Sequence, residues 1–326
     1  MTPAPDRLLR MLPAVGAAVW VGVAFSRPFD PFQRPWAEAL LLLAPLVLVP
    51  LCVRLIARID CEPVPARVRG AFLALLLPAS LSLVAALDRG PAAVAAALAV
   101  PWLAVTLFLA AGGARRVLAR GLRASLRAPE ELAPDVARLL LPVGAGWAVL
   151  ACGGVRPLQF EDVIVLLTGV HFHHAGFVLP VLAARAAREL PGRAARLACW
   201  GVMAGVPLVA AGITVTQLGG GAALELAAAW ITAAAGLLVA WLHLRLAARG
   251  SEPAAARALW AVAGLSLAAG ALFAALYGTR QAAGIAWLDI PWMRVLHGTP
   301  NALGFGLAGV LAWTLRDRSR PAGAGC

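Results

Sequence analysis

Apolar residues along this chain are grouped into ten runs that short polar links separate. The runs cover residues 8–25, 37–56, 71–87, 92–111, 139–155, 163–184, 197–217, 222–246, 259–278 and 290–315. Most have roughly the 17–25 residues that a helix needs to cross about 30 Å of hydrocarbon. They are continuous, unlike the alternating strands of a membrane barrel, so the pattern predicts an all-α, polytopic transmembrane bundle. The fifth run is short and contains glycine, which leaves nine spans as the main alternative.

The composition agrees with a single integral membrane domain over residues 1–326, with possible halves at 1–155 and 156–326. Hydrophobic residues make up 61% of the chain and charged residues 13%, against about 25% charged in a soluble domain. The mean hydropathy is +0.83. No link is long enough for a separate soluble domain, so the expected surroundings are a lipid bilayer.

The net charge of +12 is distributed in a way that predicts membrane topology. All 28 basic residues are arginines. On the ten-span reading, 22 of them fall at the two termini and in every second link, and six fall on the opposite side. Because short cytoplasmic loops are enriched in basic residues, this bias predicts that both termini are cytoplasmic, in a bacterial inner membrane. It explains the charge without a nucleic-acid partner.

The sixth run contains an unusual polar cluster, with three of the five histidines within residues 168–177. Polar groups at membrane depth are costly unless they have partners, so such a cluster predicts a functional site. At 100° per residue, His171 and His174 share a helix face with Thr168, and His173 points almost the opposite way. That opposite face is made by Gly169, Gly176 and Pro180, so a neighbouring helix could approach it closely.

The tenth run carries a second polar stripe at a similar predicted depth. Arg294, His297 and Asn301 follow a helical spacing, and Pro300 removes a backbone donor beside His297. The sequence does not show whether the sixth and tenth runs are neighbours. If they are, their imidazoles converge in the outer half of the second five spans.

Three interpretations of this cluster stay open. The first is a path for a small solute or a proton, lined by Thr168, His171, His174, Arg294, His297 and Asn301. The second is haem or copper, with His171, His173 and His297 as haem ligands and His174 as a further metal ligand, in a redox or sensor protein. The third is a scaffold in which the histidines hydrogen-bond between helices and fix their packing.

Other features point to no catalytic site. The chain has no phosphate-binding loop, no Gly-x-Ser-x-Gly elbow and no His-Glu-x-x-His zinc helix. We expect His243 at the cytoplasmic interface beside Arg245. We also expect most tryptophans, including Trp36 and Trp313, to anchor span ends at the membrane surface.

Two segments resemble the YndJ-like family of bacterial polytopic membrane proteins. They are Thr168-Gly-Val-His-Phe-His-His-Ala-Gly-Phe177, followed by Val178-Leu-Pro-Val181, and His297-Gly-Thr-Pro-Asn-Ala-Leu-Gly-Phe305. His174 stands where the family more often has tyrosine. The resemblance implies a multi-pass membrane protein, at best a transporter of unassigned substrate. A weaker resemblance, of His171-Phe-His173 to the haem-binding histidines of haem–copper oxidases, implies a haem ligand pair.

Overall fold

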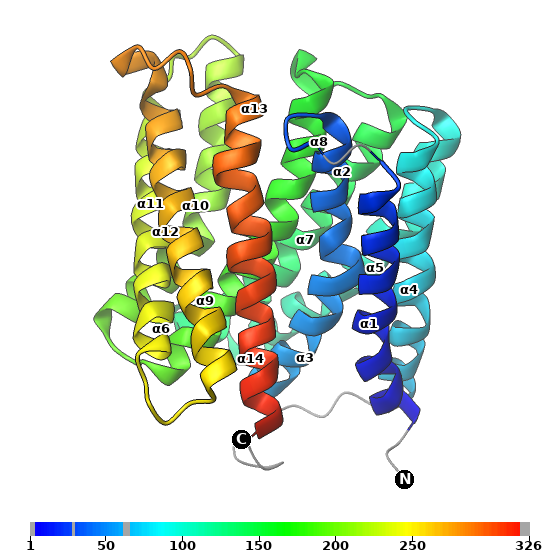
Figure 1. Cartoon of the computed structure of the whole chain (residues 1–326), viewed down its shortest axis with the longest axis vertical. Coiled ribbons are helices and arrows are strands. Elements are labelled where there is room, and N and C mark those ends of the chain that lie inside the picture. Colours follow the sequence, from blue (N-terminus) through cyan, green and yellow to red (C-terminus); the bar gives the residue numbers. More distant parts are fainter. Residues whose placement is uncertain (1–3, 28–29, 61–65, 320–326) are drawn as a thin grey trace.

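The computed structural model describes residues 4–27, 30–60 and 66–319 (Figure 1). Within these ranges the regular structure is helical. The elements are α1 (Ala4–Phe25), α2 (Arg34–Leu43), η1 (Ala44–Leu48), α3 (Val49–Asp60), α4 (Ala66–Asp88), α5 (Ala93–Arg120), α6 (Leu122–Arg127), α7 (Pro129–Gly153), η2 (Pro157–Gln159), α8 (Asp162–His171), η3 (Phe172–Val178), α9 (Leu179–Glu189), α10 (Arg193–Gln217), α11 (Ala223–Ala247), α12 (Ala254–Ala283), α13 (Ile290–Met293), η4 (Arg294–Gly298), η5 (Pro300–Leu307) and α14 (Ala308–Ser319).

The helices form rods that run up and down in a bundle (Figure 1). Three rods are composite: α2–η1–α3, α8–η3–α9 and α13–η4–η5–α14. Helix α1 begins and helix α14 ends at the same end of the bundle, which we call the terminal end. We call the opposite end the far end. Among the described residues, eight helical segments are long and apolar enough to cross a membrane. Helix α1 and the last rod are not among them, so the count of ten spans is a proposal.

Local sequence accounts for many of the helix boundaries. Pro129 occupies the first turn of α7, where a missing N–H costs nothing, and Gly154 ends that helix in a left-handed conformation with φ of 67°. At the far end the side chain of Asp289 accepts a hydrogen bond from the Trp292 N–H and so caps α13. The last rod therefore starts at the boundary that the apolar pattern predicts.

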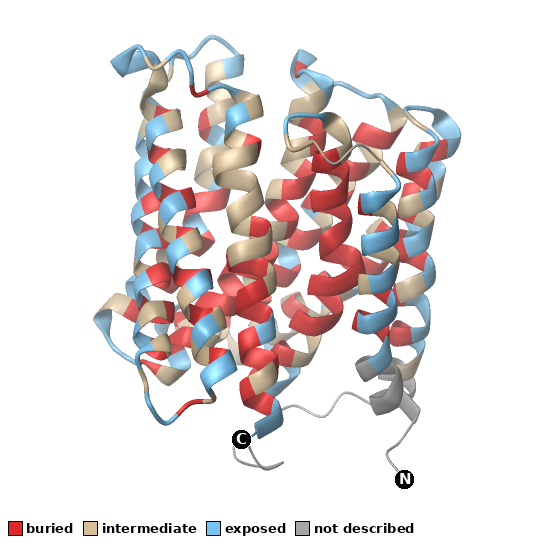
Figure 2. Cartoon of the chain, viewed as in Figure 1, coloured by how far each residue is buried: buried red, intermediate tan, exposed pale blue. Residues whose placement is uncertain are grey.

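The rod α2–η1–α3 lies at the centre of the bundle. Its residues from Trp36 to Cys52 are buried, and Figure 2 shows this rod almost entirely in red. The run Leu40–Leu43 has no polar face, as expected of a helix surrounded by protein on all sides. Trp36, which we expected at the membrane surface, is 3% exposed, and that prediction is wrong.

The long polar link predicted between the fourth and fifth spans is shorter in the structure. Helix α5 extends to Arg120 and α7 begins at Pro129, and they enclose only the short helix α6. The extension buries Asp135 completely. It accepts hydrogen bonds from Arg116, Arg120 and Arg138, with the Arg138 Nη1 atom 2.6 Å from Asp135 Oδ1. An ionic cluster therefore joins α5 to α7 within the segment that the apolar pattern leaves as a polar link.

Candidate functional site

The three composite rods meet around the predicted histidine cluster, and each contains π-helical turns. Segment η3 contacts both η1 and η5, and α2 contacts α8. A proline lies at or just after each π region, namely Pro45, Pro180 and Pro300. Because proline has no N–H, it removes one backbone hydrogen bond to the preceding turn. Single π turns inside α-helices are frequent at functional sites, and here three of them converge.

His174 faces the central rod. Its Nε2 atom lies 2.9 Å from the carbonyl oxygen of Leu40 in α2. Its Nδ1 atom is buried and has no hydrogen-bond partner among the described residues. A Cβ built on Gly306 of η5 would lie 3.6 Å from that nitrogen, so the last rod passes directly beside it. His174 thus lies where the three composite rods cross.

His297 lies in η4 and faces both the site and α12. Its Nδ1 atom is 2.8 Å from the carbonyl oxygen of Gly270 and 3.2 Å from the amide nitrogen of Asn301. His171 lies one helical turn before His174 on the same rod, at the end of α8 next to η3. The Nε2 atom of His171 is buried and unpartnered within the described chain. The two histidine-bearing rods are in contact, because η3 packs against η5 and Gly306 lies beside His174 Nδ1.

The remaining predicted site residues lie around these rings. Thr168 is half-buried and donates its hydroxyl to the Ile164 carbonyl at 2.7 Å. Arg294 is 7% exposed and donates to the Phe32 carbonyl, so it holds the segment before α2 and does not extend toward lipid headgroups. Arg294 therefore lies at the far-end margin of the site.

We expected the site to lie within the second half of the chain, but the first half also contributes to it. Besides the Leu40 carbonyl, α2 supplies Trp36, whose indole N–H donates to the Thr299 hydroxyl at 2.8 Å. Thr299 in turn donates to the Arg294 carbonyl at 2.9 Å, across the π turns of the last rod. The prediction is corrected here, because α2 of the first half is hydrogen-bonded to both histidine-bearing rods.

His173 points away from the other histidines, as the helical spacing predicts. It is completely buried against α5 and α7. Its Nδ1 atom lies 2.7 Å from the Gly169 carbonyl, and its Nε2 atom accepts from the indole N–H of Trp102 at 2.9 Å. Both ring nitrogens are used, so none is left to bind haem or a metal. Within the described ranges, no group of three or more His, Cys, Asp or Glu side chains is placed to hold a metal ion.

Helix α7 approaches the His173 face closely, as the small residues there predict. A Cβ built on Gly144 would lie 2.7 Å from His173 Nδ1 and 3.1 Å from the Gly169 carbonyl oxygen. Gly169 itself packs against the backbone of α7 at Ala148. His173 is therefore a packing residue, which agrees with the scaffold interpretation for this one histidine.

Comparison with known proteins decides the family. The model of the YndJ-like protein family matches residues 39–305. The chain belongs to the YndJ-like family. The match includes both motifs on which the resemblance depends, and it runs from the central rod into η5. No curated protein and no solved structure matches the chain.

His243 of this YndJ-like chain is not interfacial, and that prediction is wrong. It is completely buried, with Nδ1 2.9 Å from the Val239 carbonyl. Its ring packs edge-on against Phe305 and Trp313. Trp313, expected at the membrane surface, is also completely buried. Both residues fill the space between α11 and the last rod.

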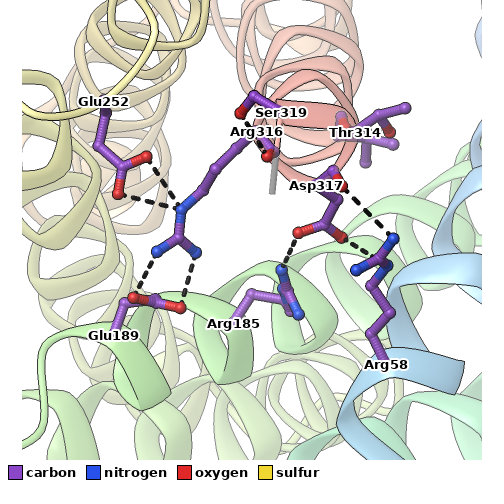
Figure 3. Close-up of polar contacts among 9 residues, drawn as sticks. Arg58, Arg185, Glu189, Glu252, Thr314, Arg316, Asp317 and Ser319 are labelled. Atoms are coloured by element: carbon purple, nitrogen blue, oxygen red, sulfur yellow. Dashed lines mark hydrogen bonds and ion pairs between the residues drawn. The ribbon is translucent and has the colours of Figure 1, made fainter. Parts of the chain in front are cut away.

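A second polar centre lies at the terminal end and was not predicted (Figure 3). Arg316 of α14 is 1% exposed and lies between two carboxylates. Its Nε atom is 3.1 Å from each carboxylate oxygen of Glu252, and its Nη1 atom donates to Glu189 at 2.6 Å. The next residue, Asp317, accepts from Arg185 at 2.7 Å and pairs with Arg58 at 3.3 Å. The only sequence signal was the Arg-Asp pair directly after an apolar run.

This terminal network, comprising Arg58, Arg185, Glu189, Glu252, Arg316 and Asp317, connects the same three composite rods. Arg58 lies on α3, Arg185 and Glu189 lie on α9, and Arg316 and Asp317 lie on α14. Glu252 comes from the link before α12. The rods that form the histidine site are therefore tied together by ion pairs on its terminal side.

Proposed function

We propose that this YndJ-like protein is a multi-pass transporter of a small solute in the bacterial inner membrane. In this proposal the chain crosses the membrane ten times, with both termini cytoplasmic. The path runs between the three composite rods and is lined by Thr168, His171, His174, His297 and Asn301. Arg294 lies at its far-end mouth.

The observation that carries the proposal is the coincidence of distorted helices with unsatisfied polar atoms. Buried polar groups in proteins are nearly always hydrogen-bonded, so orphaned ones need an explanation. Buried side-chain atoms without partners occur at several places in the described chain, and three of them are His171 Nε2, His174 Nδ1 and one end of the Asn301 side-chain amide. All three lie beside π turns. Solute sites in many transporters are formed near midplane where helices are interrupted, and π turns are a local distortion of a helix that is frequent at functional sites.

The burial pattern along the last rod supports access from the far end. Residues 295–301 are all half-buried, whereas most of the rod from Ala308 to Asp317 is buried (Figure 2). The terminal network of α3, α9 and α14 lies on the buried side. This arrangement fits a conformation that is closed at the terminal end.

A flux assay tests the proposal. The purified protein is reconstituted in vesicles, and uptake of radiolabelled acetamide, acetate and methylammonium is measured. We expect uptake of at least one solute to exceed that of protein-free vesicles. His171→Ala and His297→Ala should each lower this uptake about tenfold, the effect of losing about 1.4 kcal/mol of binding.

The control is His243→Asn, which removes a buried imidazole outside the site. It should keep wild-type uptake in preparations that elute as monodisperse protein. If none of the three solutes enters faster than in protein-free vesicles, or if His171→Ala and His297→Ala transport like wild type, the transport proposal is wrong.

A further inference from the structure

The hydrogen-bonding state of the site can be deduced from its partners, and it restricts the solute. A backbone carbonyl only accepts hydrogen bonds, so a ring nitrogen bonded to one must carry the proton. His174 Nε2 faces the Leu40 carbonyl and His297 Nδ1 faces the Gly270 carbonyl. In the neutral ring the other nitrogen is then an acceptor. His174 Nδ1 therefore presents a lone pair that has no partner in the described chain, and in His297 the lone pair lies on Nε2.

The side chain of Asn301 supplies the complementary group. The Asn301 atom 3.2 Å from His297 Nδ1 is placed as the amide nitrogen. Because a protonated Nδ1 is itself a donor, we assign the amide oxygen to that position instead. Oxygen and nitrogen of an amide are exchangeable by a 180° rotation and are assigned from such networks. The other end of the amide is buried and unpartnered. After this assignment, that end is the NH₂ donor.

The groups that would contact the solute are uncharged when the imidazoles are neutral. They are imidazoles, an amide and a hydroxyl, whereas the charged guanidinium of Arg294 lies at the far-end margin of the site, bound to the Phe32 carbonyl. A charged solute transferred among these neutral groups would lose its hydration and gain no counter-charge from them, which is strongly unfavourable. A neutral solute that both donates and accepts hydrogen bonds would satisfy the free groups.

We infer that the solute is uncharged and carries both a hydrogen-bond donor and an acceptor, as in a primary amide or a hydroxyl compound. This inference rests on the proposed function and specifies its substrate class. In the bound state, the solute donates to His174 Nδ1 or His297 Nε2 and accepts from the Asn301 NH₂ group.

Three isosteric probes test the inference: acetamide, acetate and acetamidinium. They share a planar shape and differ in charge. The protein, labelled with ¹⁵N in its five histidine rings, is held in lipid nanodiscs at pH 8, where free imidazole is neutral. Ring signals are assigned by replacing one histidine at a time with glutamine and are then followed as each probe is added.

We expect acetamide to shift the imine nitrogen signals of His174 and His297 saturably, while equal concentrations of the two ions leave them unchanged. The His173 and His243 signals serve as internal controls and should not move. Asn301→Ala should weaken the acetamide response at least severalfold. A saturable response of the site signals to acetate or acetamidinium, or no response to acetamide, would overturn the inference.

The two proposals fail separately. Acetate uptake that depends on His171 and His297 would leave transport standing and remove the inferred substrate class. Acetamide binding without uptake of any solute would refute the transport proposal and would leave a binding site for an uncharged ligand.

Discussion

Replacing Arg316 with methionine tests the terminal network most directly. The guanidinium contacts two carboxylates, at 2.5 Å and 2.6 Å from the Glu189 oxygens and 3.1 Å from those of Glu252. Methionine fills a similar volume without a charge. The carboxylates of Glu189 and Glu252 would then lie on either side of the space that the guanidinium had filled. Glu252 is only 8% exposed.

The magnitude follows from breaking a buried ion pair by removing one partner. Such a change costs about 3–5 kcal/mol, because the remaining charges stay buried and lose their guanidinium partner. The Glu189 side chain is 26% exposed and keeps some water, so we expect about 3 kcal/mol. That corresponds to roughly a hundredfold change in the equilibrium constant for unfolding.

The assay is unfolding in mixed micelles with increasing SDS, followed by tryptophan fluorescence. Trp313 is a suitable reporter because its ring centroid lies 5.1 Å from the Arg316 guanidinium carbon. The matched control is Arg318→Met, since Arg318 is exposed and lies two residues further along the same helix. We expect it to change the unfolding free energy by less than about 0.5 kcal/mol.

Adding Glu189→Gln and Glu252→Gln to Arg316→Met should restore most of the lost stability. Neutral replacement of a whole buried ionic group is often tolerated where removal of one partner is not. The reasoning is wrong if Arg316→Met and Arg318→Met destabilise equally, or if the triple variant is no more stable than Arg316→Met alone.

Two further predictions concern the packing around His173. Trp102→Phe removes the N–H donated to His173 Nε2, and leaving that buried nitrogen unpaired should cost about 1–3 kcal/mol in the same assay; unchanged stability would contradict the hydrogen bond. Gly144→Ala forces a Cβ to 2.7 Å from His173 Nδ1 and should cost about 1–3 kcal/mol by overpacking. Gly146→Ala on the same helix meets nothing within 4 Å and should not destabilise, so equal losses at both glycines would refute the close approach.

Much of the local geometry could be predicted from the sequence. The apolar runs indicated helical rods whose ends agree within a few residues at several boundaries, such as Ile290 and Gln217. Helical spacing alone separated His173 from His171 and His174, because side chains two apart point in nearly opposite directions. The glycines beside His173 predicted a close neighbour, which proved to be α7. These features depend only on residues near one another in the chain.

The pairing of distant groups could not be predicted. Arg316 meets partners 64 and 127 positions away in the chain, and no local pattern specifies which carboxylates those are. The burial of Trp36 has a signal in the sequence around it. The run around Leu41 is apolar on every side, which is typical of a helix surrounded by protein.

The partner of His174 shows why side-chain patterns give an incomplete account of such a site. The Leu40 carbonyl is a backbone group, available at almost any residue type, so no letter in the sequence marks it. For the same reason, alanine at position 40 would leave that acceptor in place, and a side-chain scan of α2 would pass over it. The contact depends instead on how α2 lies against η3, which is set by the packing of the whole central rod. The position of His174 in the site therefore depends on α2, a helix that contains no histidine.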